Sequence, residues 1–194
     1  MTIEPQRVDG RTARSERTRN AIVDALVSLL AEGHLRPTAD RIAKTAGVSL
    51  RALWSHFADL ESLFTASAQR VLERRDAAFE SIPADLPLAD RIRAYCNQRA
   101  RLCEMIAPAA RAAALKEPFS PALQHHRKLH IKRVREEVRV LFAAEIKDDS
   151  ELLNAITAVS MWHTWDTMRT PMEMSLDEAR ATLERTVTAL FGVR

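Results

Sequence analysis

The sequence predicts an all-α protein in which a three-helix N-terminal head joins a larger helical body, with about nine helices in total. Apolar residues recur at helical spacing along most of the 194 residues, and no strand-like alternation is present. Only 4 glycines occur, which disfavours turn-rich β architectures. We therefore divide the chain into a flexible N-terminal arm at residues 1–14, the head at 15–60 and the body at 61–194.

Composition is that of an ordinary soluble globular protein, with 46% hydrophobic and 28% charged residues. The net charge of +3 is too small to indicate a nucleic-acid partner by itself. No apolar run reaches the roughly 18 residues that span a membrane, and the N-terminus lacks the apolar core of a signal peptide. Cys96 and Cys103 would lie about 10.5 Å apart on one helix, beyond the roughly 7 Å limit for a disulfide. We therefore expect a reduced, cytoplasmic protein with no membrane partner.

The first helix is predicted from about Ser15 to Glu32, where Gly33 ends it. The arm before it is polar and carries several arginines. It is either a frayed tail or a segment that touches phosphates or the minor groove. The helix itself has an apolar stripe at helical spacing, formed by Ile22, Ala25, Leu26, Leu29 and Leu30.

Two short helices joined by a tight turn follow, in the stretch from Thr38 to Phe57. Thr38 is an N-cap residue, because its hydroxyl can accept a backbone N–H that has no partner within the helix. Gly47 stands where a left-handed residue is needed, and Ser49 caps the second helix. Residues of the second helix at helical spacing, Leu53, Trp54 and Phe57, would pack back on the first.

The outward side of this second helix carries mostly small side chains and one guanidinium group, that of Arg51. The residues on this side are Ser49, Leu50, Arg51, Ala52 and Ser55. A helix-turn-helix of this kind fits the major groove of DNA, which is about 12 Å wide. A helical hairpin without any DNA role can have the same pattern.

The next helix is predicted from an Asp59 cap to about Ser81, before Pro83. Its apolar face includes Val71, Leu72 and Phe79. This face is longer than the part that the head could cover. This helix should therefore run from the head into the body.

The body is predicted as five further helices. The first runs from about Leu88 to Ile106 with Tyr95, Cys96 and Arg99 along it, and a break or kink is expected at Ala107 because Pro108 follows. A short alanine-rich helix continues to Lys116. The last three helices are predicted at about Pro121–Ile146, Glu151–Met168 and Ser175–Phe191, the last of them with a Ser175–Glu178 capping box.

The head resembles that of the TetR (TetR/AcrR) family of bacterial transcriptional regulators, and the match covers roughly the first third of the chain. The resemblance implies a homodimeric, ligand-responsive regulator, a repressor, that binds a palindromic DNA operator and leaves it on binding a small-molecule effector. No cofactor is implied. The matching residues are Ile42, Ala43, Ala46, Gly47, Val48, Ser49, Leu53, Trp54, His56, Phe57, Asp59, Glu61 and Leu63.

The same resemblance assigns roles to single residues of the head. Arg51 is the best candidate for reading a base, since arginine can bind guanine in bidentate fashion. Leu50 or Ala52 would touch a thymine methyl group, and Thr38, Lys44 and His56 would hold phosphates. Trp54 stands where the family usually has a tyrosine that reaches a phosphate, so it either donates its indole N–H there or only packs. Leu60 departs from the family, which commonly has a lysine there. The predicted DNA-binding set is Thr38, Lys44, Ser49, Leu50, Arg51, Ala52, Trp54 and His56.

The family pairs its last two helices with those of a second copy. The resemblance therefore implies a dimer interface here, although a larger monomeric core would give the same apolar pattern. The predicted interface residues are Ile156, Leu183, Val187 and Leu190.

Family bodies bind small molecules between helices, and the candidate pocket residues here are Phe119, Leu123, His126, Trp162, Trp165 and Met168, each of which would equally suit plain core.

No sequence motif of an enzyme is present, neither a phosphate-binding glycine loop nor GxSxG, HExxH or paired CxxC. His126 and His130 are spaced to reach one metal ion, yet the flanking charges are positive, so we expect neither a metal site nor catalysis. The alternative to a regulator is an all-helical protein that binds a partner or small molecule and whose head no longer reads DNA.

Overall fold

The computed structural model describes residues 10–192, and this part of the chain forms ten α-helices and one short 3₁₀ helix. The predicted all-α fold is confirmed. The elements are α1 (Gly10–Ala31), α2 (Ala39–Thr45), α3 (Leu50–His56), α4 (Leu60–Ala77), α5 (Leu88–Ala114), η1 (Glu117–Phe119), α6 (Pro121–Leu141), α7 (Ala143–Ile146), α8 (Ser150–Val159), α9 (Trp162–Arg169) and α10 (Leu176–Leu190).

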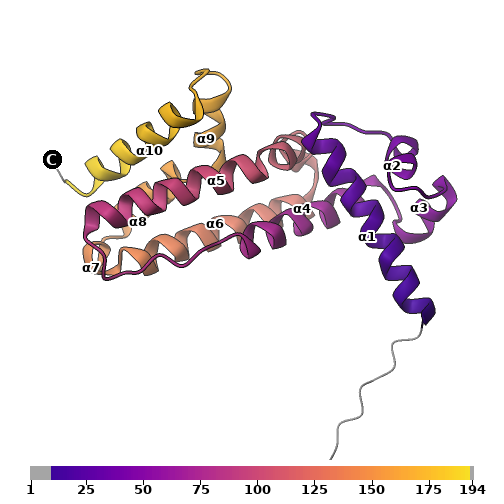
Figure 1. Cartoon of the computed structure of the whole chain (residues 1–194), viewed down its shortest axis with the longest axis horizontal. Coiled ribbons are helices and arrows are strands. Elements are labelled where there is room, and N and C mark those ends of the chain that lie inside the picture. Colours follow the sequence, from indigo (N-terminus) through magenta and orange to yellow (C-terminus); the bar gives the residue numbers. More distant parts are fainter. Residues whose placement is uncertain (1–9, 193–194) are drawn as a thin grey trace, which may run out of the picture.

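The molecule is elongated, with α1–α3 at one end and the remaining helices extending along the long axis (Figure 1). α5 and α6 run the length of the body, and α10 lies along α5. None of the described helices is long and apolar enough to cross a membrane.

The helix pair of the head has the predicted capping pattern. The Thr38 hydroxyl accepts the Arg41 N–H at 3.3 Å, and the Ser49 hydroxyl accepts the Ala52 N–H at 3.1 Å. Gly47 has φ +67°, the left-handed conformation that ends α2. These caps fix where α3 begins and therefore which of its side chains point outward.

The core of the head is continuous with the two helices that follow it. Ile22 and Leu26 of α1 and Leu53 of α3 are fully buried, and they belong to one apolar cluster with Leu63 of α4 and Ala112 of α5. The three-helix head is therefore completed by helices that belong mainly to the body.

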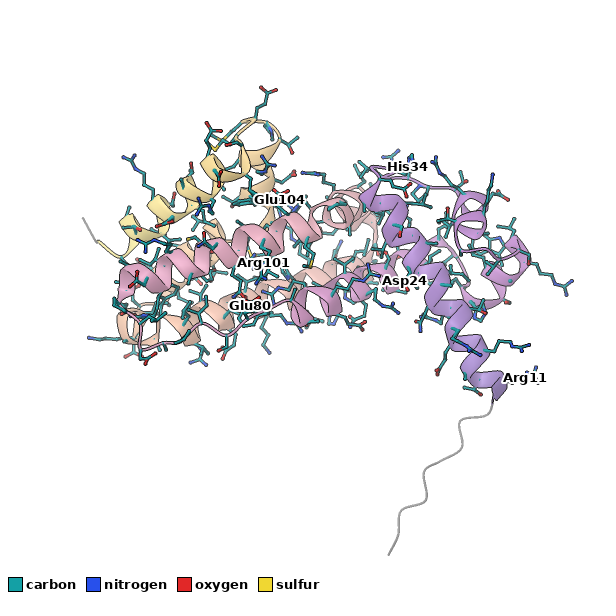
Figure 2. All side chains as sticks on the ribbon, viewed as in Figure 1. Arg11, Asp24, His34, Glu80, Arg101 and Glu104 are labelled. Atoms are coloured by element: carbon teal, nitrogen blue, oxygen red, sulfur yellow. The ribbon has the colours of Figure 1, made fainter. Side chains whose placement is uncertain are left out.

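α4 is held to α1 by polar contacts as well. Arg70 and Arg74 donate to the Asp24 carboxylate at 3.0 and 2.7 Å, and Arg70 also donates to the Asn20 side chain at 2.7 Å. Asp24 lies where α1 passes α4 (Figure 2). The Asp59–Ser62 capping box fixes the first turn of α4.

The body has its own core, formed by α5, α6, α7, α8, α9 and α10. Tyr95 packs edge-on against Phe142 at a centroid distance of 5.6 Å, and Ile156, Leu183 and Val187 are almost completely buried in the same cluster.

The start of α1 and the end of α4 differ from the sequence prediction. α1 begins at Gly10, so residues 10–14 of the predicted arm are helical, while residues 1–9 lie outside the described part. α4 ends at Ala77 rather than near Ser81, which leaves Phe79 outside the helix and 38% exposed.

Of the break or kink predicted at Ala107, the break is absent, because α5 continues through Pro108 to Ala114. The proline removes one backbone donor from the helix. Ile106, Ala107 and Ala112 are buried on both sides of it. Packing therefore outweighs the local preference.

Two helices predicted as continuous are each divided, which raises the total above the expected nine. α6 ends at Leu141, and α7 begins after Phe142, whose φ and ψ are −113° and 28°. α8 ends at Val159, and α9 begins after Met161, which is extended with ψ 151°. The second break frees the Ser160 carbonyl, and the buried Arg99 side chain donates to it at 2.7 Å.

Candidate nucleic-acid interface and interhelical cavity

The outward surface of α3 has the character that the sequence predicted. Leu53 and Phe57 are buried, while Leu50 is 37% and Trp54 41% exposed. Arg51 is exposed and forms no ion pair with any described residue. Its five donors are therefore available to a ligand outside the chain.

None of the eight predicted DNA-binding residues is buried. Ala52 and His56 are half-buried, and the other six are exposed. Trp54, which was expected to pack back on α2, is not part of the buried core. Thr38 and Ser49 use their hydroxyl oxygens as helix caps, so their further contacts must come from the hydroxyl hydrogen or the backbone.

The cations of the α2–α3 pair differ from those of the body in their partners. Lys44 and Arg51 have no acidic partner among the described residues, and Arg41 contacts only the imidazole of His34, at 2.6 Å. Most body arginines are instead paired, as Arg101 is with Glu80 at 2.8 Å (Figure 2). Unpaired cations on a protein surface can neutralise the phosphates of DNA when the protein binds.

A cavity of about 120 Å³ lies between α4, α5, α6 and the start of α9. Its wall is mostly apolar, and three of the six predicted pocket residues belong to it, Leu123, His126 and Trp162. Sequence reasoning missed most of the rest, because alanines and apolar residues facing a cavity have the same spacing as residues facing a core. The main residues it missed are Phe64, Ser67, Val71, Leu72, Ile106, Ala110, Glu117, Arg127, His130, Met161 and His163.

The other three predicted pocket residues lie elsewhere. Phe119 is 87% exposed on η1, and Met168 is part of the body core. Trp165 is also in that core, where its indole N–H donates to the Glu104 carboxylate at 2.8 Å. These three do not line the cavity.

Several polar atoms at the cavity wall are buried without a partner. They are Nδ1 of His126, both ring nitrogens of His130 and Nε1 of Trp162. Burial, followed by repulsion from Arg99, Arg75 and Arg133, lowers the pKa of His130 to about 3. His130 is therefore neutral at physiological pH and offers one donor and one acceptor.

His126 and His130 do not form a metal site of the usual kind. Among residues 10–192, no three His, Cys, Asp or Glu side chains are arranged to hold a metal ion. The pKa of His126 is lowered by burial and by His125, and the arginines near His130 repel any cation.

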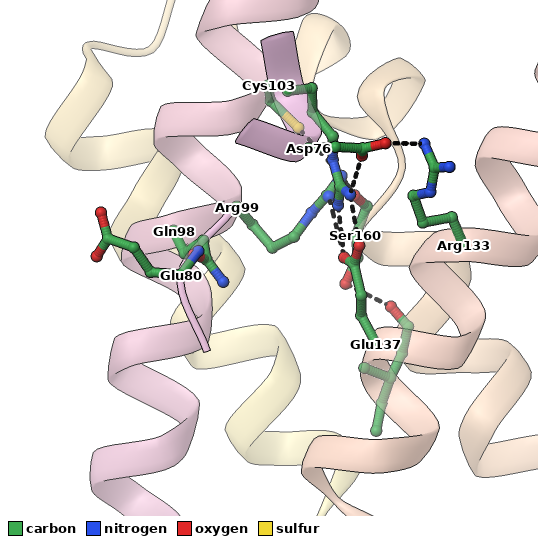
Figure 3. Close-up of polar contacts among 10 residues, drawn as sticks. Asp76, Glu80, Gln98, Arg99, Cys103, Arg133, Glu137 and Ser160 are labelled. Carbon is green, nitrogen blue, oxygen red and sulfur yellow. Dashed lines mark hydrogen bonds and ion pairs between the residues drawn. The ribbon is translucent and has the colours of Figure 1, made fainter. Parts of the chain in front are cut away.

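A buried ionic cluster lies behind His130 and joins four parts of the chain. The Arg75 guanidinium of α4 contacts the Glu137 carboxylate of α6 at 2.5 Å, and both Arg75 and Arg99 of α5 are 1% exposed. Arg99 lies 4.0 Å from Glu137 and donates to the Ser160 carbonyl between α8 and α9 (Figure 3). Arg133 pairs with Asp76 at 2.7 Å.

One position in the sequence indicates this cluster. Most charged side chains of α6 are exposed, but Glu137 faces inward. Arg99 lies on the apolar stripe of α5 beside Tyr95 and Cys96, which is an unusual position for an unpaired charge.

The structure also places the four predicted interface residues. Ile156, Leu183 and Val187 are at most 3% exposed within one chain, and Leu190 is half-buried against the same core. The first three therefore have no surface left to offer a second copy. The exposed positions on these helices include small residues such as Ala158 and Ala189.

No family model and no curated protein matches the sequence. Solved structures do match it. A transcriptional regulator from Rhodococcus sp. Rha1 superposes with a TM-score of 0.69 at 18% identity, over 92% of this chain and 96% of the other. A protein from Mesorhizobium loti, described as a TetR-family transcriptional regulator, gives 0.68 at 18% identity, over 92% and 97%. The multidrug-binding protein EbrR, complexed with imidazole, gives 0.61 at 19% identity, over 87% and 93%.

Proposed function

Because the chain has the fold of TetR-family transcriptional regulators, we propose that it is a DNA-binding regulator that represses transcription and is released by a small-molecule effector. The observation that carries the proposal is the exposed Arg51 on α3, which has no partner in the described chain. In this proposal residues 15–60 bind DNA, and residues 61–194 bind the effector and a second copy.

The roles proposed for the head divide into base and phosphate contacts. Arg51 reads a guanine, with Leu50 and Ala52 beside it against thymine methyl groups. Lys44 and His56 contact phosphates, as do the capped ends at Thr38 and Ser49, whose helix N-termini favour anions. The 41% exposed indole of Trp54 supports a phosphate contact through its N–H.

The proposed dimer uses the outward faces of α8 and α10. Small exposed residues there, Ala158 and Ala189, allow close approach of helices from a second copy. The core residues Leu183 and Val187 support these faces from behind. Such a dimer binds a palindrome whose half-sites lie about one helical turn, 34–36 Å, or a multiple of it apart.

The effector is proposed to act on α4. Phe64, Ser67 and Val71 of α4 line the cavity, and Leu63 of the same helix belongs to the core of the head. A ligand that prefers one tilt of α4 therefore changes the distance between the two α3 helices of a dimer. That EbrR is complexed with a small molecule supports the use of this fold for such binding.

The test is a binding selection with purified protein on random duplex DNA, followed by a gel shift on the enriched sequence and on DNA that flanks the protein's own gene. A palindromic consensus bound by the wild type, and bound weakly by Arg51→Ala, is the expected result. Enrichment of no sequence by the folded protein would contradict the proposal and favour a head that no longer reads DNA.

A further inference from the structure

The wall of the interhelical cavity carries donors that no described residue satisfies. The indole N–H of Trp162 and the ring nitrogens of His130 are buried, and neither residue's ring makes a hydrogen bond with any part of the described chain. A buried donor without a partner destabilises the folded chain, and a hydrogen bond to a ligand acceptor would remove this penalty. Both residues line the same cavity, so one ligand can reach both.

The charges behind this wall have a positive surplus. The side chains around His130 are three arginines, Arg75, Arg99 and Arg133, and the acids paired with them are two, Glu137 and Asp76. An anion or a strong acceptor in the cavity is attracted by this surplus, and a cation is repelled, more strongly than in water because the site is poorly solvated.

The remaining charges at the cavity do not reverse this balance. Glu117 also lines it, but its carboxylate is paired with Arg127 at 2.9 Å. No other carboxylate lines the cavity within residues 10–192. The cavity therefore lacks a free anion that could recognise an amine.

Size and shape narrow the ligand further. The cavity of about 120 Å³ is close to the roughly 150 Å³ that holds benzene in an engineered apolar site. Phe64, Val71, Leu72 and Ile106 supply apolar walls for a ring.

We propose that the cavity binds a small aromatic compound bearing a carboxylate or carbonyl oxygen, which accepts hydrogen bonds from Trp162 and His130, and that it discriminates against aromatic amines. This inference rests on the proposed function, since it names the chemical class of the effector. In the unliganded chain the nitrogens have no exposed surface. The ligand oxygen therefore reaches them only as the walls move apart, and α4 is one of those walls.

The experiment compares four probes with the same ring: benzoate, benzamide, benzylamine and toluene. Each is titrated into purified full-length protein, followed by calorimetry and by the shift in melting temperature. Benzoate and benzamide are expected to bind at least about 10-fold more tightly than benzylamine or toluene, because only they present an oxygen to the two donors.

Variants connect the binding to the two residues. Trp162→Phe keeps an aromatic ring and removes the N–H, and His130→Leu removes both ring nitrogens. Each should weaken benzoate binding about 10-fold while toluene binding stays the same. His125→Leu is the matched control, because His125 is exposed on α6 and does not line the cavity.

Equal affinity for benzoate and benzylamine overturns the inference, as does benzoate binding that neither variant weakens. Binding of none of the four probes at their solubility limits overturns it too. A gel shift on the same samples separates this inference from the proposed function. Sequence-specific DNA binding without probe binding leaves the regulator standing and removes the ligand class. Probe binding without DNA binding supports the ligand class and contradicts the proposed regulator function.

Discussion

Arg75 of α4 and Glu137 of α6 form a buried ion pair at 2.5 Å, with the arginine side chain 1% and the glutamate 12% exposed. Glu137 is also the only acid described within 4.0 Å of Arg99. One carboxylate thus balances guanidinium groups from two other helices, in a place where water cannot screen them.

Replacing Glu137 by Gln leaves the buried guanidinium of Arg99 without a described acid within 4.0 Å and leaves that of Arg75 with Asp76 alone. We expect a loss of about 3–5 kcal/mol in the free energy of unfolding, measured by urea denaturation. Glu136→Gln is the control, because Glu136 pairs only with Arg139 on the surface and its loss should change stability little. Equal stabilities for the two variants would mean that the buried pair is compensated elsewhere.

The two kinds of contact proposed for the head differ in their mutational effect. Arg51→Ala should cost about 1–3 kcal/mol on the selected site and relax the preference at one base pair per half-site. His56→Ala should weaken all sequences alike, because phosphate contacts carry no direct sequence information. Binding selections on both variants check this, and identical specificity profiles would show that the roles are assigned wrongly.

His130 makes stability depend on pH in a defined window. Its pKa is about 3 in the folded chain against 6.5 for an unperturbed histidine, because it is buried and faces Arg99, Arg75 and Arg133. Between these values the unfolded chain binds more protons than the folded one, so stability falls as pH drops below 6.5. The loss should reach about 2 kcal/mol near pH 5.

His130→Leu should flatten this dependence between about pH 6.5 and 5, a range above the usual pKa of glutamate and aspartate. Urea denaturation across the range measures it, with His125→Leu as the exposed control. His126 and His163 also have pKa values lowered by burial, so some slope remains. A slope in His130→Leu as steep as in the control would contradict the assignment.

Charges placed on α8 and α10 should have opposite effects at exposed and buried positions. Ala158→Glu with Ala189→Glu should yield a folded monomer, because both alanines are exposed within one chain. Leu183→Glu should instead unfold the body, since Leu183 is 3% exposed in its core. Sedimentation and circular dichroism distinguish the two, and a double alanine variant that stays dimeric excludes this face.

The link between cavity and head is best tested at Val71. This residue of α4 is 8% exposed, lines the cavity and packs in one cluster with Trp162. Val71→Ala should alter ligand-induced release of DNA more than ligand-free DNA binding, within the 5–150-fold range typical of such coupling. DNA affinity is measured with and without benzoate.

Phe79→Ala provides the comparison for Val71→Ala. Phe79 was expected on the same apolar helix face as Val71, but it lies beyond the end of α4 and is 38% exposed, with its ring 5.4 Å from the Arg75 guanidinium. The ratio of DNA affinities with and without ligand should therefore stay close to that of the wild type. A larger effect at Phe79 than at Val71 would show that the signal leaves the cavity by another route.

The head could be predicted from sequence because its structure is set locally. The caps at Thr38 and Ser49 and the left-handed Gly47 act within a few residues, and the structure has all three. The body was less predictable because long-range packing decides it. Pro108 suggested a break that burial of its neighbours overrides, and the break at Met161 follows from no local residue preference.

The candidate site shows the same division. Arg51 and its neighbours are exposed as expected, since the period of a short capped helix determines which side chains face outward. The position of the cavity depends on where the apolar faces of neighbouring helices do not pack completely against each other. Helical spacing carries no information about that, and the two predicted pocket residues Trp162 and Trp165 are divided between the cavity wall and the body core.

Cys96 and Cys103 have a practical consequence that follows from their place inside α5. Both thiols are free and at most 1% exposed, and burial raises the pKa of Cys96 to about 12. A thiol-labelling reagent needs an exposed thiolate, so it can modify either residue only when the surrounding helices separate. The labelling rate of the wild-type protein therefore reports how often the body opens, with no engineered cysteine introduced.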